Sequence, residues 1–209
     1  LKAPILPDSD FVPHVVDCIR ASGIADRLLL VSFRHDLLQQ AKALMPELRI
    51  GVLTLGDLLS MMLPPPVIWQ DLGLVNSMDE PLDEENCPAL KKQVGMVSSV
   101  ISDKLTLIAA LYPQMSVRQI LATLSAQADP AAYVRTLGSP VELVSCEYHT
   151  AFANPEVVNQ LHDVGCKAAF WTVNTEDVVR SLVPLGPDCF VTDRPDVIRE
   201  WIEKAQTET

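Results

Sequence analysis

The stretch from Lys167 to Pro195, KAAFWTVNTEDVVRSLVPLGPDCFVTDRP, constrains the fold of this chain more than any other. Its first apolar run, residues 168–173, is too short for a helix and rich in aromatic and β-branched residues, so it predicts a buried strand. Apolar residues then recur at helical spacing up to Gly186, and a second apolar run follows at 189–192. A strand, a short helix and a strand in this order predict a βαβ unit, and such units build parallel sheets.

Three other apolar runs predict strands at 27–33, 48–54 and 141–147. Amphipathic stretches predict helices between and around them, and a last helix at 195–204. The sequence therefore predicts an α/β protein with five strands, all joined in the manner of βα units.

Polar residues close the last two predicted strands, at Thr172 and Asn174 and then at Thr192 and Asp193. In parallel α/β folds, ligands bind at the carboxyl ends of the strands. These residues belong to two motifs, WTVN and VTDRP, which are separated by a helix that begins with acidic residues. This arrangement resembles the carboxyl-terminal end of the glycerophosphodiester phosphodiesterases. The alternative is a generic βαβ unit with a buried Trp171.

A second passage, VSFRHDLLQQAKALMPELRIGVLT at residues 31–54, resembles the segment of the same family in which a Ser-Phe strand end precedes a helix and a glycine-containing strand. The resemblance implies a TIM barrel, (β/α)8, that hydrolyses glycerophosphodiesters to glycerol phosphate and an alcohol with a divalent metal, magnesium or calcium. It also implies substrate-binding roles. Trp171 and Phe33 would form facing apolar walls, with the Trp171 N–H toward an anionic oxygen, and Asn174 would fix the loop after its strand.

The first two residues, Leu1-Lys2, fit the end of a Glu-x-Lys motif that closes a strand in the resembled family. On this reading Lys2 is catalytic, and the metal-binding Glu lies just before this chain. The alternative is an ordinary solvated lysine at a terminus.

Two histidines follow predicted strands, and histidine titrates near neutral pH. His35 follows the Ser-Phe strand, where the resembled family has no catalytic histidine, so we do not expect it to act in catalysis. His149 follows the strand at 141–147, on the side where ligands bind, and is a candidate substrate-binding residue.

The resemblance covers the carboxyl-terminal half of the family domain, with about five of the eight strands that a closed barrel needs. The His-Arg-Gly strand, the Glu-x-Asp strand and the His-Asp hairpin that supply the family's histidines and metal ligands are not found in this chain. We therefore expect no metal ligands here and an inactive isolated chain. The missing amino-terminal half would act in cis or in trans. The alternatives are a non-catalytic binding module and an unrelated α/β enzyme.

The segment from Leu55 to Pro140 is far longer than a usual barrel loop. It holds a proline-rich break, an acidic linker and two stretches with helical spacing, so it predicts a lid-like helical insertion at the carboxyl end of a strand. Residues 1–54 and 141–209 would supply the barrel units. A partner-binding or membrane-surface element is the alternative for the insertion.

The chain has 209 residues and a formal net charge of −11, with 48% hydrophobic residues, which is typical of a folded protein. Its acidity argues against binding nucleic acid, which requires clustered Lys and Arg. Charges interrupt the longest apolar stretch, so we expect no membrane span. Five scattered cysteines predict small buried thiols rather than a disulfide framework, which favours a reducing, cytoplasmic location.

Overall fold

The computed structural model describes residues 1, 8–55, 65–91 and 99–207. Within these ranges, five parallel strands form one sheet in the order in which they occur along the chain. This order, with a helical crossover between neighbours, is that of a (β/α) barrel, and the open edges at β1 and β5 make it an incomplete one. The strands are β1 (Leu29–Ser32), β2 (Arg49–Thr54), β3 (Leu143–Glu147), β4 (Lys167–Trp171) and β5 (Cys189–Phe190).

The five predicted strands and the α/β class are confirmed, with small shifts at the boundaries. The strand predicted at 27–33 begins later because Ala25–Arg27 form a single 3-10 turn. The helix predicted to end at Gly186 consists of an α-helix that ends at Leu182 and a 3-10 turn, Val183–Leu185. It stops there because Gly186 has a φ of 74°, a left-handed conformation that favours glycine.

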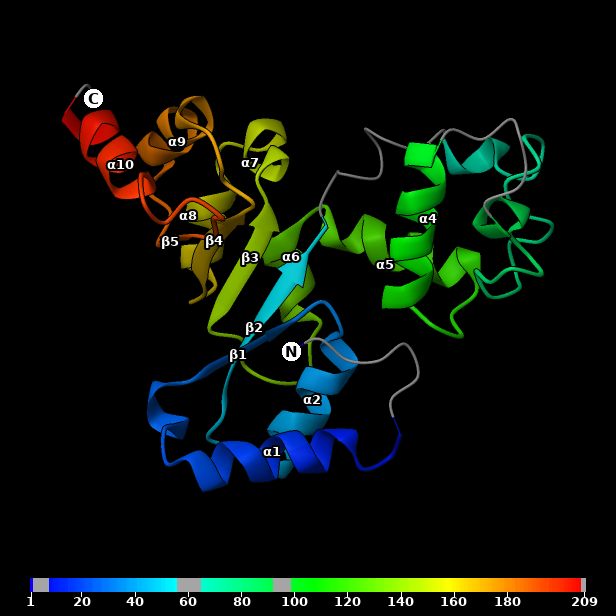
Figure 1. Ribbon diagram of the computed structural model, residues 1–209, viewed down its shortest axis with the longest axis horizontal. Coiled ribbons are helices and arrows are strands. Elements are labelled where there is room, and N and C mark those ends of the chain that lie inside the picture. Colours follow the sequence, from blue (N-terminus) through cyan, green and yellow to red (C-terminus); the bar gives the residue numbers. More distant parts are fainter. Residues whose placement is uncertain (2–7, 56–64, 92–98, 208–209) are drawn as a thin grey trace.

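One face of the sheet is covered by helices and holds the main hydrophobic core (Figure 1). The alternation of a strand sends Ile50 and Val52 of β2, Val144 of β3 and Phe170 of β4 into this core, where each is at most 1% exposed. The helices on this side are α1 (Phe11–Ser22), α2 (His35–Leu44), α8 (Val157–Asp163), α9 (Glu176–Leu182) and α10 (Ile198–Thr207), with the short α7 (His149–Ala153) above β3.

The opposite face of the sheet corresponds to the interior of a complete barrel. Here Val31, Leu53 and Leu143 are only half-buried, although they are apolar residues in adjacent strands. Val191, just beyond β5, is 45% exposed. The residues that the structure describes therefore leave this face partly open to solvent.

Between β2 and β3, helices α4 (Ser99–Leu111), α5 (Val117–Gln127) and α6 (Pro130–Arg135) are joined by irregular segments with 3-10 turns at Pro66–Ile68 and Pro88–Lys91. In Figure 1, α4 stands apart from the helices that flank the sheet, and α5 lies between α4 and α6. Helices α4 and α5 share a second core with Trp69 and Leu55, and Phe33 and Trp171 pack against this core from the carboxyl ends of β1 and β4. Part of the apolar stretch predicted to be helical, residues 92–98, lies outside the described ranges.

Helix α6 falls inside the residues predicted as the insertion, but it packs on the main core. Its Ala131 and Val134 belong to the cluster under the sheet, and α6 contacts α8. It therefore flanks the sheet in the way that a barrel helix between β2 and β3 would.

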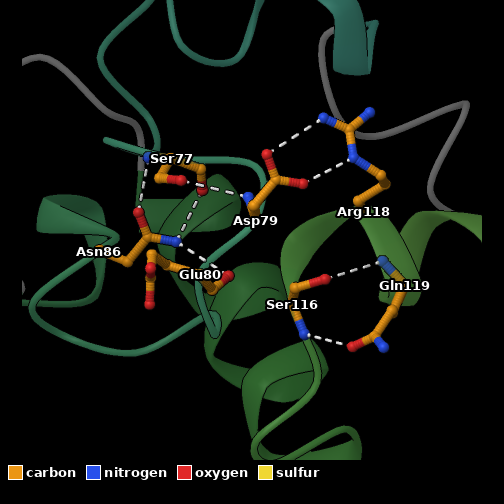
Figure 2. Close-up of polar contacts among 7 residues, drawn as sticks. All are labelled: Ser77, Asp79, Glu80, Asn86, Ser116, Arg118 and Gln119. Carbon is orange, nitrogen blue, oxygen red and sulfur yellow. Dashed lines mark hydrogen bonds and ion pairs between the residues drawn. The ribbon is translucent and has the colours of Figure 1, made fainter.

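The start of α5 is fixed to the irregular segment before it by a polar network (Figure 2). Ser116 and Gln119 form a capping box, in which the side chain of each accepts a hydrogen bond from the backbone N–H of the other. Nearby, the amide of Asn86 donates to the carbonyl groups of Ser77, Glu80 and Pro81, which closes a compact turn. Glu80 lies in this turn, and its backbone carbonyl accepts a hydrogen bond from the backbone N–H of Val117.

Three of the five cysteines, Cys87, Cys146 and Cys166, are buried thiols as predicted. The prediction is wrong for Cys18 and Cys189, which are exposed. Cys18 lies on the outer side of α1, and Cys189 lies on the edge strand β5. Among the described helices, none has the length and apolar character needed to cross a bilayer.

Candidate functional site

The carboxyl ends of β1 and β4 meet through two aromatic rings. Phe33 and Trp171 contact edge to face, with ring centroids 5.3 Å apart and planes at 85°. Strands β1 and β4 are separated by two others, which on a flat sheet would place them about 14 Å apart. The contact therefore indicates that the sheet curls so that side chains from its carboxyl ends converge.

The Trp171 indole N–H donates to the backbone carbonyl of Ser145 at 3.0 Å. This corrects the expectation that the N–H points toward an anionic substrate oxygen, because a carbonyl of the neighbouring strand already takes it. The ring itself remains half-buried at the end of β4. Its direct contact with Phe33 also means that the two rings adjoin rather than face each other across a gap.

Asn174 joins the loops that follow β4 and β5. Its side-chain carbonyl accepts from the Thr192 hydroxyl at 3.1 Å and from the Asp193 backbone N–H at 2.9 Å, and its amide donates to the Asp193 carboxylate at 2.8 Å. These bonds fix both loops at the carboxyl edge of the sheet. A contact between Asn174 and a substrate stays a prediction.

His149 is held by a buried carboxylate at the end of β3. Glu147, only 4% exposed, places one oxygen 2.8 Å from the His149 Nδ1 and accepts from the His149 backbone N–H with the other at 2.9 Å. The His149 ring stacks on Tyr148, with centroids 4.2 Å apart. Glu147 pairs with Trp171 in the sheet register, so His149 and Trp171 follow neighbouring strand ends. The substrate role of His149 stays a prediction.

His35 is buried at the start of α2, where both of its ring nitrogens are hydrogen-bonded within the chain. Its Nε2 donates to the carbonyl of Leu53 at 2.9 Å, so its Nδ1 accepts from the Tyr133 hydroxyl at 2.6 Å. Burial lowers the pKa of His35 from its ordinary value, although the bond to Leu53 opposes that shift. The buried ring is therefore in its neutral form at neutral pH.

The polar contacts beside His35 extend to a second tyrosine, Tyr112, through Gln127. The Gln127 amide donates to the Tyr112 hydroxyl at 3.1 Å, and its carbonyl accepts from the backbone N–H of Leu55 at 3.5 Å. Burial raises the pKa of Tyr112 to about 12. The sequence prediction missed these residues, although Gln127 continues the apolar stripe of Ile120 and Leu124. A polar residue on an apolar stripe indicates a buried partner.

A cavity of about 240 Å³ lies at the carboxyl end of β1, between the start of α2, α6 and the turn from α4 to α5. We call it the β1 cavity. Phe33 forms part of its wall and so connects it with Trp171. The other lining residues are Arg34, His35, Asp36, Leu111, Tyr112, Pro113, Met115, Thr123 and Tyr133.

The predicted catalytic Lys2 lies outside the described residues. Leu1 is described, and it contacts the outer edge of β1. Its amino group donates to the Val31 carbonyl, and its own carbonyl accepts from the Ser32 hydroxyl at 2.9 Å. Residue 1 thus lies beside β1, where a neighbouring strand would pair.

The residues that the structure describes do not fit a divalent metal. No group of three or more His, Cys, Asp or Glu side chains is close enough to hold an ion within residues 1, 8–55, 65–91 and 99–207. Glu147 and His149 supply only two ligating side chains, and these are bonded to each other.

The fold defines this chain as an incomplete α/β barrel in which side chains converge at the carboxyl ends of the strands. The profile of the glycerophosphoryl diester phosphodiesterase family matches residues 76–197, more than half of the chain. The chain therefore belongs to that family. The match includes the WTVN and VTDRP motifs, whereas the Ser-Phe passage at 31–54 lies before it.

Solved structures resemble the fold. A chain from Silicibacter pomeroyi, assigned as a glycerophosphoryl diester phosphodiesterase, superposes with a TM-score of 0.51 at 19% identity. The superposition covers 93% of the present chain and 44% of the Silicibacter chain. A chain from Galdieria sulphuraria, assigned as a glycerophosphodiester phosphodiesterase, superposes with a TM-score of 0.50 at 13% identity. The superposition covers 95% of the present chain and 53% of the Galdieria chain. The present chain thus spans about half the length of these structures. A comparison with curated proteins returned no match.

Proposed function

We propose that this chain is the carboxyl-terminal part of a glycerophosphodiester phosphodiesterase that hydrolyses its substrate to glycerol phosphate and an alcohol. In this reaction a water oxygen bonds to phosphorus, the bond from phosphorus to the alcohol oxygen breaks, and a proton reaches the departing oxygen. The family membership of residues 76–197 and the open sheet support the proposal. An amino-terminal half, in cis or as a separate chain, would pair with the edge of β1.

Within this enzyme, the chain's own residues would form one wall of the substrate site. Trp171 and Phe33 would present apolar ring surface to the substrate, and Asn174 would hold the two loops beside it. His149, oriented by Glu147, would contact the substrate. Lys2 would lie near the phosphate as a catalytic cation. A divalent metal, magnesium or calcium, would be bound by residues outside this chain, in a reducing, cytoplasmic compartment.

The single observation that carries the proposal is the convergence of Phe33 and Trp171 at the carboxyl ends of β1 and β4, inside the fold of this family. Carboxyl strand ends are where the active sites of (β/α) barrels lie. The indole N–H is already bonded to the sheet, so Trp171 would act through its ring.

The first experiment assays the 209-residue chain with and without the amino-terminal half, in magnesium, calcium or chelator. We expect metal-dependent release of glycerol phosphate only when both halves are present, because the loss of acid–base groups alone costs about 10²–10⁴-fold in rate. Metal-dependent turnover by the chain alone would show that the active site is elsewhere. No turnover by the joined halves, together with partner capture through α4 and α5, would favour a binding module.

The second experiment tests Trp171 in the joined enzyme. Trp171→Ala should lower kcat/KM markedly, since it removes a wall of the site. Trp201→Ala is the control, because Trp201 packs on the main core and lies outside the candidate site. Equal losses in kcat/KM from both variants, at matched folded fractions, would contradict a substrate role for Trp171.

A further inference from the structure

A groove of about 440 Å³ lies along α4, between this helix and the turn that Asn86 closes. We call it the α4 groove. Its helical side follows one face of α4 over about 10 Å, at positions i, i+3, i+4 and just beyond the helix end at i+7. The residues at these positions are Thr106, Ala109, Ala110 and Pro113. Because the two alanines are short, the backbone of a docked helix can come close to α4.

The opposite side of the groove is held in place by the chain itself. Leu82 and Leu90 supply its apolar surface, and they belong to the second core or pack against it. The Asn86 amide closes the turn that carries Leu82 (Figure 2), and the backbone N–H groups of Val117 and Arg118 bond this turn to the start of α5. A wall that is fixed in this way loses little conformational freedom on binding, which favours association.

The rim of the groove is negative. Asp83 and Glu84 line it, and both are exposed. Asp83 accepts from the backbone N–H groups of Glu85 and Asn86, each at 2.9 Å, so its carboxylate is held at the rim. In the described part of the chain, no ion pair compensates Asp83, Glu84 or Glu85. The rim therefore attracts Lys and Arg side chains and repels phosphodiesters, nucleic acids and anionic lipid surfaces.

We propose that the α4 groove binds a segment of a partner protein that presents an apolar helical face flanked by Lys or Arg. A helix docks in a groove through apolar anchors at i, i+3 or i+4, and i+7, which matches the length of the helical side of this groove. The positive flanks would meet Asp83 and Glu84. The inference goes beyond the proposed hydrolysis and does not depend on it, and it gives the segment between β2 and α6 a role in assembly.

The test measures the fluorescence anisotropy of a labelled peptide on titration with the 209-residue chain. The probe is a designed helical peptide of about 15 residues, with leucines along one face and lysines beside them. One control peptide has glutamate in place of every lysine, and the other has serine in place of every leucine. We expect the probe to saturate with a dissociation constant on the order of 10–100 μM, and each control to bind at least about 10-fold more weakly. Equal binding of either control, or no saturation by the probe at about 1 mM chain, would overturn the proposal.

Variants place the peptide in the groove. Glu84→Lys should weaken binding about 2- to 10-fold, because an attraction becomes a repulsion at an exposed site. Glu47→Lys is the matched control, with the same change of net charge at the exposed turn between α2 and β2. Ala110→Leu should fill the groove and abolish saturation, whereas Ala122→Leu, at an exposed alanine of α5, should leave the affinity unchanged. If Ala110→Leu does not fold, equal effects of Glu84→Lys and Glu47→Lys would still overturn the proposal.

Two other occupants of the groove would give different results. Vesicles of phosphatidylserine and phosphatidylcholine should not sediment the chain, because the rim repels an anionic surface. Sedimentation with these vesicles, abolished by Ala110→Leu, would make the groove a membrane contact and overturn the proposal. Analytical ultracentrifugation should give the same mass for the parent and Ala110→Leu. A dimer that this variant dissociates would identify a second copy of the chain as the occupant and also overturn it.

Discussion

Phe33 and Trp171 touch edge to face across the carboxyl ends of two strands that are not neighbours in the sheet. They also pack on the second core, so the pair connects the sheet with the segment that holds α4 and α5. Any displacement of one ring would therefore alter both the candidate site and the support of that segment.

The coupling between the two rings can be measured by a double-mutant cycle. We expect Phe33→Leu and Trp171→Leu each to destabilise the chain, with an interaction free energy of about 0.5–1.5 kcal/mol beyond additivity, as is typical of aromatic pairs. Urea unfolding of the four proteins gives this value. The pair Phe33→Leu and Trp201→Leu is the control, and additivity in both cycles would show that the ring contact is energetically unimportant.

The buried His35 predicts a pH dependence of stability. Burial lowers its pKa in the folded chain below the ordinary 6.5. Between the lowered value and 6.5 the unfolded chain binds more protons, so the free energy of unfolding rises with pH there. The stabilisation should be complete above pH 6.5 and decline as the pH falls toward the lowered pKa. Denaturant unfolding between pH 5 and 8 measures it.

The matched variant for this measurement is His35→Gln, which cannot titrate. We expect it to be less stable than the parent at pH 8, because the Tyr133 hydroxyl and the Leu53 carbonyl lose their partner. Its stability should also vary less with pH between 5 and 7. A variant that retains the full slope would assign the pH dependence to other groups.

The network at the start of α5 predicts unequal effects from two polar residues (Figure 2). Ser116→Ala removes the side-chain oxygen that caps Gln119 and should cost about 1 kcal/mol of stability. Asp79→Asn removes the ion pair with Arg118, but both groups are solvent-exposed, so we expect no resolvable change. Thermal unfolding of the two variants distinguishes them, and a larger effect from Asp79→Asn would reverse this assignment.

Gly51 in β2 lets three strands approach on the open face of the sheet. A Cβ at this position would lie 2.9 Å from the Val31 side chain and 3.2 Å from that of Leu143. Gly51→Ala should therefore destabilise by about 1–3 kcal/mol through overpacking. Gly138→Ala is the control, since the atom nearest to its added Cβ, in Gln39, is 4.0 Å away. Equal effects in urea unfolding would show that the sheet relaxes freely around residue 51.

The sequence alone determined the five strands and the class of fold. Apolar runs with β-branched and aromatic residues predicted all five strands, because the strands of a parallel sheet pack against helices and so are mostly apolar. Gly186 predicted the end of its helical segment because only glycine adopts a left-handed conformation without strain. The WTVN and VTDRP motifs predicted the family, since they are continuous in the chain.

The tertiary structure decided what depends on residues far apart in sequence. In the folded chain, α6 packs on the main core under the sheet, and the Trp171 indole N–H donates to the Ser145 carbonyl. His35 is hydrogen-bonded to Tyr133, which lies 98 positions further along the chain. No periodicity encodes these contacts, because a hydrogen-bond partner is set by the curvature of the sheet and the packing of helices on it. The β1 cavity has the same origin: its walls come from separate segments that only the folded chain brings together.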